Sequence, residues 1–144
     1  MSSRRLEDLH PDLQLEAKDM INVLGVYGID YLIYCTYRDD IEQDNLYKIG
    51  RTLPGKIVTN AKAGQSKHNF KLNGKPASKA FDGVPLIGGK PLWSQWIMDT
   101  TGRKTLHPVW ERVGEVGRSL GLQWGNDWKG RFKECPHWEL KEII

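Results

Sequence analysis

The stretch IDYLIYCTYR, residues 29–38, is an almost unbroken run of apolar, β-branched and aromatic residues. Such a run predicts a buried strand, and here the strand ends at Arg38. The preceding residues, 11–28, repeat apolar side chains at helical spacing after a proline and close on glycines, which predicts a helix. Residues 39–50 begin with two aspartates that can cap a second, shorter helix. The first part of the predicted fold is therefore a strand between two helices.

The rest of the chain continues to mix helices with strands. The segment KAFDGVPLI (79–87) is typical of a strand, and HPVWERVGEVGRSLG (107–121) has the apolar face of a helix. HWELKEII (137–144) predicts a last strand, whereas the Gly-, Lys-, Asn- and Ser-rich residues 51–79 predict a loop with short extended pieces. There is no βαβ rhythm. We therefore expect an α+β fold, with a small, mostly antiparallel sheet flanked by helices in a single domain over residues 1–144.

Composition and charge narrow the class of protein. Apolar residues make up 39% of the chain and include six Trp, which is typical of a folded globule rather than a disordered chain. The net charge of +3 favours contact with an anionic surface such as a cell wall. No apolar run follows the basic start and none is long enough to span a bilayer, so we expect a soluble protein made in the cytosol, without stable membrane association. Cys35 and Cys135 are expected to be free thiols there, with a disulfide as the alternative.

The four histidines fall into two kinds. His10 and His107 each precede a proline at a predicted helix start, where a capping role is expected. His68 lies in the polar loop segment GQSKHNF, whose small residues could surround a ligand. His137 lies in ECPHWEL and opens the last predicted strand. The second pair are therefore the candidates for chemistry.

An aspartate and a glutamate extend this pair into a candidate metal site. Asp82 lies in a strand-like apolar segment, where a carboxylate is costly unless it is paired or bound to a metal. Taken together, His68, Asp82 and His137 make a three-ligand set that leaves zinc an open fourth position. Because Pro136 marks the strand start, Glu134 would lie in a loop, free to turn towards the same metal as a general base. The alternatives are a solvated loop histidine, an aspartate that caps a turn, and a glutamate paired with a lysine.

Three ordered segments carry a family resemblance. SKH (66–68), AFD (80–82) and ECPHWEL (134–140) together resemble the S-x-H, A-x-D and [D/E]-x-x-H pattern of zinc D-alanyl-D-alanine carboxypeptidases. That family includes phage endolysins that act as L-alanyl-D-glutamate endopeptidases, and the hedgehog signalling domains resemble these peptidases. GRTLPGKIVTNAKAGQSKHN (50–69) is similar to the endolysin branch in particular. The likeness runs over about residues 6–140, which is nearly the whole chain.

The resemblance implies a role for each matching residue. It implies zinc (Zn2+) on His68, Asp82 and His137, with Glu134 as the general base and acid. Arg38 would steady a substrate carboxylate or the developing oxyanion, a role that suits a guanidinium, with a salt bridge to a neighbouring aspartate as the alternative. The resemblance also implies a set of substrate-binding residues, which are Ser66, Trp124, Asp127 and Trp128. For the two tryptophans, core packing remains an equal alternative.

The sequence departs from the family pattern at one point. The family keeps its His and Asp closer together than His68 and Asp82 are here, and we interpret KLNGKPAS (71–78) as an insertion that forms a projecting loop. Cys135 lies two residues before His137, and its thiolate is an alternative ligand for the metal. We expect its side chain to point away from the site.

The resemblance implies a phage-type endolysin, a zinc endopeptidase that hydrolyses the peptide stem of bacterial peptidoglycan, at the L-Ala–D-Glu bond, for host cell lysis. Such an enzyme would accumulate as a monomer in the host cytoplasm and reach the cell wall after release by a pore-forming partner, a holin. One alternative is a D-Ala–D-Ala carboxypeptidase, and another is a non-catalytic metal- or wall-binding domain. A nucleic-acid-binding domain would rest on charge and aromatics alone, so nucleic acid is not an expected partner.

Overall fold

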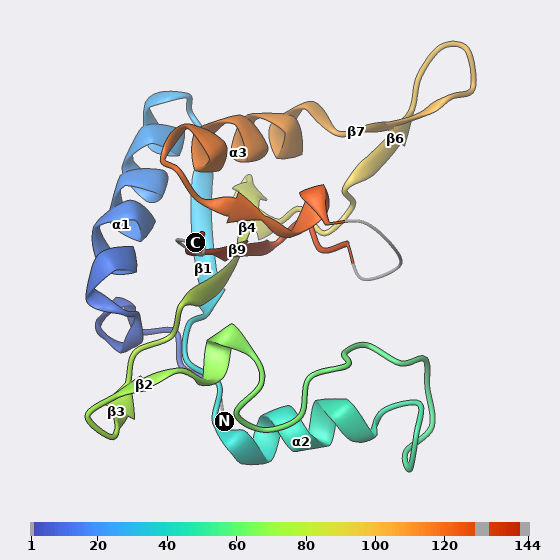
Figure 1. The fold of residues 1–144 in the computed structure, drawn as a ribbon. Helices are drawn as coiled ribbons and strands as arrows, with labels where there is room; N and C mark the ends of the chain where they lie inside the picture. The colour runs from blue at the N-terminus through green and yellow to red at the C-terminus, as the bar shows by residue number, and fades with distance from the viewer. Residues whose placement is uncertain (1, 129–132, 142–144) are drawn as a thin grey trace.

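Strands that lie far apart in the sequence meet in one antiparallel sheet in the computed structural model, which describes residues 2–128 and 133–141 (Figure 1). The strand order is β1-β4-β9-β8, and β5 pairs with the end of β4. The strands of this sheet are β1 Asp30–Cys35, β4 Ala80–Ile87, β5 Lys90–Pro91, β8 Gln123–Trp124 and β9 His137–Glu139. The predicted α+β class with an antiparallel sheet is confirmed. Residues 142–144 of the last predicted strand, and 129–132 of the chain before it, lie outside the described residues.

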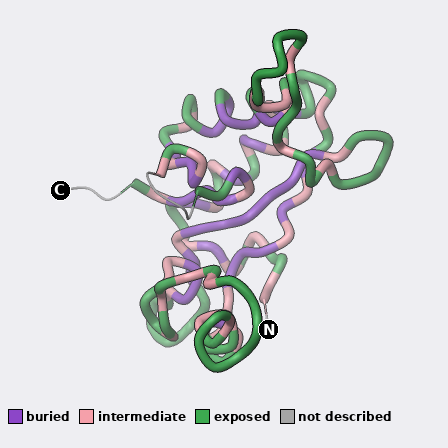
Figure 2. The backbone as a smooth tube through the Cα atoms, turned by 90° about the vertical axis from the view of Figure 1, so that its right-hand side faces the viewer, coloured by how far each residue is buried: buried purple, intermediate pink, exposed green. Residues whose placement is uncertain are grey.

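Helices cover one face of the sheet. The α-helices are α1 Pro11–Val26, α2 Asp40–Lys48 and α3 Pro108–Ser119, and the 3-10 turns are η1 Leu6–Asp8, η2 Lys67–Asn69 and η3 Gly125–Asp127. Helices α1 and α3 pack on each other and on the sheet, whereas α2 lies apart from them beyond the end of β1 (Figure 1). Figure 2 shows that buried residues follow the sheet and the inner sides of these two helices, and that the projecting loops are exposed. None of the helices in the described part of the chain has the length and apolarity to cross a membrane.

Both His–Pro pairs begin a helix. Nδ1 of His10 accepts a hydrogen bond from the backbone N–H of Asp12 at 3.1 Å, at the start of α1. Nδ1 of His107 accepts one from the N–H of Val109 at 3.0 Å, at the start of α3. In each case the proline occupies the first helical turn, where its missing N–H leaves no bond unmade. The predicted capping roles of His10 and His107 are confirmed.

Two stacked tryptophans form the contact between the sheet and α3. The rings of Trp124 and Trp138 lie parallel, with centroids 5.4 Å apart, and both are buried. Gly114 and Gly117 of α3 face these rings so closely that a Cβ atom on either glycine would overlap a ring. The side chain of Trp138 therefore points towards α3. Because successive side chains on a strand alternate, its two neighbours on β9 point to the opposite face of the sheet.

A small hairpin contains the insertion that the sequence predicts. Strands β2 Lys71–Leu72 and β3 Lys75–Pro76 pair across Asn73 and Gly74, whose φ angles are 51° and 75°. Positive φ at both central residues is typical of a tight two-residue hairpin turn. The hairpin projects from the end of the molecule that carries α2 (Figure 1). The predicted projecting loop is confirmed, and β4 pairs with β1 and β9 directly after it.

A second hairpin forms within residues 92–106, a segment whose sequence favours neither a helix nor a strand. Strands β6 Trp96–Met98 and β7 Lys104–Leu106 pair with each other and extend away from the sheet (Figure 1). The ammonium of Lys104 lies 5.4 Å from the centroid of the Trp96 ring. The exposed apolar residues of β6 are Trp96, Ile97 and Met98.

Candidate active site

Asp82 occupies the centre of a cluster that the sheet register assembles. It lies opposite His137 of β9 on one side and opposite Cys35 of β1 on the other. The register of β1 shifts at a bulge between Ile33 and Cys35, which aligns Cys35 with Asp82. Residues that are directly opposite across neighbouring strands share a face of the sheet. The three side chains therefore lie in a row on the face turned away from α1 and α3.

His68 reaches this row from the 3-10 turn η2. The hydroxyl of Ser66 caps the turn by accepting from the N–H of His68 at 3.2 Å, and the carbonyl of His68 accepts from the N–H of Arg38 at 3.0 Å. Nδ1 of His68 lies 2.8 Å from the carbonyl oxygen of Thr36. A carbonyl can only accept, so Nδ1 carries a proton, and Nε2 is the nitrogen left to face a cation. Nε2 lies 3.4 Å from Oδ2 of Asp82, and no partner within the described ranges forms a hydrogen bond with it.

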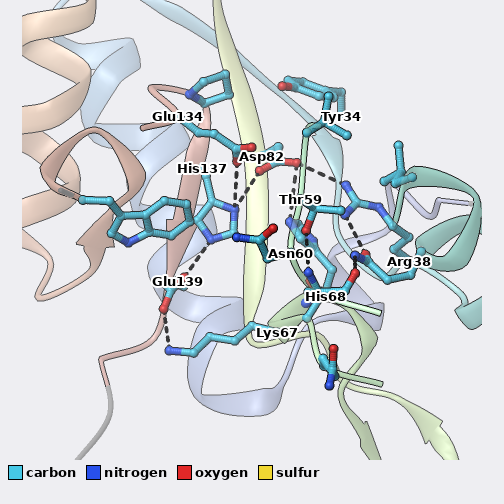
Figure 3. A pocket seen from close by; sticks show the side chains of 18 residues that line it. Tyr34, Arg38, Thr59, Asn60, Lys67, His68, Asp82, Glu134, His137 and Glu139 are labelled. Atoms are coloured by element: carbon cyan, nitrogen blue, oxygen red, sulfur yellow. Dashed lines mark hydrogen bonds and ion pairs between the residues drawn. The ribbon is translucent and has the colours of Figure 1, made fainter. Parts of the chain in front are cut away.

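His137 approaches the same carboxylate from β9. Its Nδ1 lies 3.2 Å from Oδ1 of Asp82 and 3.8 Å from Oε2 of Glu134 (Figure 3). Its Nε2 lies 2.9 Å from Oε1 of Glu139. The ring of His68 meets the ring of His137 edge-on, with centroids 5.2 Å apart. The structure thus brings the four residues of the predicted metal and base set into one cluster.

The donor set fits a divalent cation, and two observations support this. First, the buried Nε2 of His68 faces a carboxylate. Second, the other nitrogen of each imidazole is bound to a fixed acceptor, which is Thr36 for His68 and Glu139 for His137, as in metal-ligating histidines. Zinc bonds of about 2.0–2.1 Å in a tetrahedron require ligand atoms about 3.3–3.4 Å apart. The separations of 3.4 Å and 3.2 Å between the imidazole nitrogens and Asp82 match that spacing.

Asp82 is shared by two groups of potential ligands. Across the residues that the structure describes, potential ligand atoms lie within 4.8 Å of one another in the group Cys35, His68 and Asp82, and in the group Asp82, Glu134 and His137. The predicted ligands His68, Asp82 and His137 span the two groups, with Asp82 common to both. The zinc site itself stays a prediction.

The charges in the cluster are strongly coupled. Burial alone would raise the pKa of Asp82, but the imidazoles of His68 and His137 hold it well below its usual range. Burial opposes the charged form of His68, yet the Asp82 carboxylate raises the pKa of His68 to about 10. Burial also raises the pKa of Glu134, while His137 opposes this shift and Asp82 adds to it. Protons on the imidazoles therefore balance the buried Asp82 carboxylate, and a bound cation would take their place.

The cluster lies in a cleft of about 780 Å³ (Figure 3). The sheet and the η2 turn form one side of the cleft, and residues 58–61 line another. Arg38 lies in the cleft with Nη2 3.8 Å from Oδ2 of Asp82, and its Nη1 donates to Oε1 of Gln43 at 3.1 Å. The side chain of Glu134 is 47% exposed, so its carboxylate is accessible from the cleft. A guanidinium and a carboxylate thus flank the two imidazoles.

Two of the four predicted substrate-binding residues line the cleft. Trp128 does, with its ring centroid 4.7 Å from that of His137, and so does Ser66 beside the η2 turn. Trp124 is a correction. It pairs with Trp138 between β8 and β9, faces α3 and is only 2% exposed, so it packs in the core.

Asp127 is a second correction. Its carboxylate binds Arg118 of α3, with Nε of Arg118 donating to Oδ2 at 3.0 Å on the exposed surface, and it does not line the described cleft. This ion pair fixes η3 to α3, which accounts for the aspartate. Its sequence position beside Trp128 could not reveal on which side of the turn its side chain lies.

The structure also adds residues to the site that sequence reasoning missed. Both cysteines are free thiols, as expected. Cys135 is buried in the hydrophobic core, whereas Sγ of Cys35 lies 3.8 Å from Nδ1 of His68. Glu139 and Lys67 form an ion pair below His137. The alternation of side chains in HWE could have placed Glu139 on the face of His137. No sequence signal could have revealed the position of Cys35, because it depends on the bulge in β1.

Comparisons with known proteins relate this chain to peptidoglycan endopeptidases. No family model matches the chain. The chain is 38% identical over 133 residues to the peptidoglycan L-alanyl-D-glutamate endopeptidase CwlK of Bacillus subtilis (strain 168), over 92% of this chain and 74% of that protein. Its structure is similar to that of the Serratia marcescens L-Ala D-Glu endopeptidase ChiX, with a TM-score of 0.57 and 18% identity over 98% of this chain and 89% of the other. The second likeness concerns the fold alone.

Proposed function

Because the chain belongs to the family of peptidoglycan L-alanyl-D-glutamate endopeptidases, we propose that it hydrolyses the peptide stem of bacterial peptidoglycan at the L-Ala–D-Glu bond, as a zinc enzyme. The observation that carries the proposal is the pair of imidazole nitrogens that face one buried carboxylate at the base of an open cleft. An isolated structural cluster would not need access from such a cleft. This arrangement is suited to hydrolysis of a peptide that enters it.

The metal would be held by His68, Asp82 and His137, because one nitrogen of each imidazole faces the Asp82 carboxylate. When bound, zinc supplies Lewis acidity, which polarises a carbonyl oxygen and lowers the pKa of water towards neutrality. The protein holds the two imidazoles for this task through Thr36 and Glu139, which take up their other nitrogens. These contacts fix the two rings, and a cation bound by all three residues would draw His68 and His137 towards each other across Asp82.

Glu134 is the proposed general base and acid. Its Oε2 lies 3.8 Å from Nδ1 of His137, so it is close to the metal position and still open to the cleft. Partial burial raises the pKa of Glu134, and a carboxylate with a raised pKa both accepts a proton from the attacking water and returns it to a leaving amine. The surface salt bridge with a lysine that the sequence left open is not needed to explain its position.

Arg38 is the proposed electrostatic partner of the substrate. Its guanidinium lies in the cleft beside Asp82 and is held by Gln43, whose amide donates to the carbonyl of Ala61 at 2.7 Å. A guanidinium fixed in this way binds a substrate carboxylate or stabilises negative charge that develops on a carbonyl oxygen. Ser66 and Trp128, at the cleft surface, are the proposed substrate contacts.

The biological setting follows the endolysin likeness. We propose a phage-type enzyme that accumulates as a monomer in the host cytoplasm, reaches the wall after a holin opens the membrane, and lyses the host. The net charge of +3 favours approach to an anionic wall.

Digestion of purified peptidoglycan tests the proposed reaction. The new amino termini are labelled and identified by mass spectrometry, with and without added zinc. New D-Glu amino ends are expected. Release of free D-Ala as the sole product would instead indicate a carboxypeptidase. Binding to the wall with no new amino ends from the native chain would indicate a non-catalytic binding domain.

A further inference from the structure

A second ion pair lies directly beneath the histidines and joins the two elements that carry them. Lys67 of η2 immediately precedes His68, and Glu139 of β9 follows His137 by two residues. The ammonium of Lys67 is paired with Oε2 of Glu139, and it also donates to the carbonyl of Leu140 at 3.2 Å (Figure 3). We propose that Lys67 and Glu139 are positioning residues that select which nitrogen of His137 faces the cation and hold the segments of the two histidines side by side.

Glu139 determines the state of the His137 ring. Its Oε1 lies 2.9 Å from Nε2 of His137, and an ionised carboxylate can only accept a hydrogen bond. Nε2 must therefore carry a proton, which leaves Nδ1 as the nitrogen that faces Asp82 at 3.2 Å. A ring turned over would place Nε2 towards Asp82 and lose the bond to Glu139. The carboxylate thus fixes one orientation of the imidazole, and it keeps a proton on Nε2 when a cation replaces the proton that Nδ1 shares with Asp82.

Lys67 holds this carboxylate in place. The side chain of Glu139 is only 10% exposed, so its charge needs a partner inside the protein. Lys67 supplies that partner from the element that carries His68. The two segments are already held side by side by the backbone. The N–H of Lys79 donates to the carbonyl of Lys67, and the N–H of Leu140 donates to the carbonyl of Lys79, both at 3.0 Å. The ion pair therefore sets the side chains, and its loss should leave the fold intact.

The proposal rests on the proposed function only in taking a divalent cation as the ligand. Zinc affinity of the full chain is measured by competition with a chromophoric chelator at constant pH. Glu139→Ala is expected to weaken zinc binding by about 10–100-fold, the usual effect of losing an outer partner of a metal-ligating histidine. Glu139→Gln, which retains an acceptor oxygen, should lose less. Lys79→Met is the matched control, because it also removes a lysine, but one whose ammonium lies over the Phe70 ring, 3.9 Å from the centroid. The zinc affinity of this variant should equal that of the native chain.

A charge exchange separates positioning from a simple cross-link. The double variant Lys67→Glu with Glu139→Lys restores an ion pair between η2 and β9, but an ammonium cannot accept a hydrogen bond from Nε2. It should therefore remain as weak in zinc binding as Glu139→Ala. Recovery of native affinity by the exchanged pair would overturn the tautomer role, and native affinity in Glu139→Ala would overturn the whole proposal.

The ring nitrogens provide a readout that does not require activity. Nitrogen NMR of the native chain should show His137 protonated at Nε2, and Glu139→Ala should shift the two ring resonances towards a mixture of tautomers. Unchanged resonances would contradict the proposal. If the native chain binds no zinc, the proposed function fails. The same resonances, recorded in zinc-free protein at a pH where the imidazole is neutral, still decide the role of Glu139.

Discussion

At the scale of single residues, histidine serves two purposes in this chain, and the partner of one ring nitrogen decides the use of the other. His10 and His107 accept a hydrogen bond at Nδ1 from a backbone N–H and begin a helix. His68 and His137 donate from one nitrogen to a fixed oxygen and turn the other towards Asp82. Removal of a histidine of each kind should therefore have different consequences.

His68→Ala is expected to abolish zinc binding, because it removes one of the two imidazoles that face the Asp82 carboxylate. Zinc content after dialysis, measured by mass spectrometry of the metal, checks this. His107→Ala is the matched control. It should cost about 1 kcal/mol of unfolding free energy through the lost cap of α3 and retain its zinc. Loss of zinc from both variants alike would contradict the assignment of His68.

Glu134→Gln should lower kcat by about 10²–10⁴-fold, because an amide cannot accept and return a proton. Its zinc content should equal that of the native chain, since the three proposed ligands are untouched. Hydrolysis of a stem-peptide substrate, assayed beside metal content, checks both expectations. Near-native turnover would remove Glu134 from the mechanism and leave the metal site unaffected.

At the scale of elements, the approach of α3 to the sheet decides which face of β9 carries the site. Gly114 and Gly117 allow the helix to lie directly on the rings of Trp124 and Trp138. With Trp138 held against the helix, the residues on either side of it must face the cleft. The packing of the core thus presents His137 and its partner Glu139 to Asp82.

Gly117→Ala is expected to destabilise the protein by about 1–3 kcal/mol, because the added methyl group overlaps the Trp138 ring in a packed core. Urea denaturation followed by tryptophan fluorescence measures this. Gly25→Ala in α1 is the matched control, because its added Cβ meets no heavy atom within 4 Å. Alanine there should stabilise the helix by about 0.5–1 kcal/mol. Stabilisation by both changes would show that helix propensity, not ring overlap, dominates.

At the scale of the whole molecule, the proposed cation would connect parts of the chain that are otherwise joined by a few contacts. Asp82 and His137 belong to the sheet, and His68 belongs to η2, on the side of the molecule that carries α2. A ligand that binds the folded chain alone stabilises it in proportion to the logarithm of its concentration. Stability should therefore depend on zinc.

Chelation is expected to lower Tm. Zinc at a hundredfold excess over Kd would contribute about 2.7 kcal/mol, which for a chain of this size corresponds to about 10 °C in Tm. Thermal unfolding followed by circular dichroism, with zinc and with a chelator, measures the difference. His68→Ala should unfold at one temperature under both conditions. A native Tm that zinc leaves unchanged would contradict the site.

Local sequence patterns were sufficient for most elements of this fold, because capping residues, prolines and apolar periodicity act over a few residues. The helices α1, α2 and α3 and the strands β4 and β9 all follow from such signals. The ordered motifs located the residues that cluster at Asp82, although the insertion separates two of them. The motifs could be found in the sequence because each is short and contiguous.

Three features could not be predicted, because each depends on how elements meet. Cys35 approaches His68 through a bulge that shifts the register of β1. Trp124 lies in the core because β8 turns its face towards α3, and Asp127 is held by an arginine of that helix. Register, strand orientation and packing between helices involve residues far apart in the chain, and a single sequence carries no direct record of them.

The β2–β3 hairpin begins and ends at nearly the same point, since the N–H of Ala77 donates to the carbonyl of Phe70 at 3.0 Å. Its length can therefore vary without moving His68 relative to Asp82. A motif search that demands a set number of residues between these two positions would overlook relatives that carry such an extension. For the same reason, the turn at Asn73 and Gly74 is a favourable point at which to insert an epitope or a wall-targeting peptide, because the added chain would leave the cleft open.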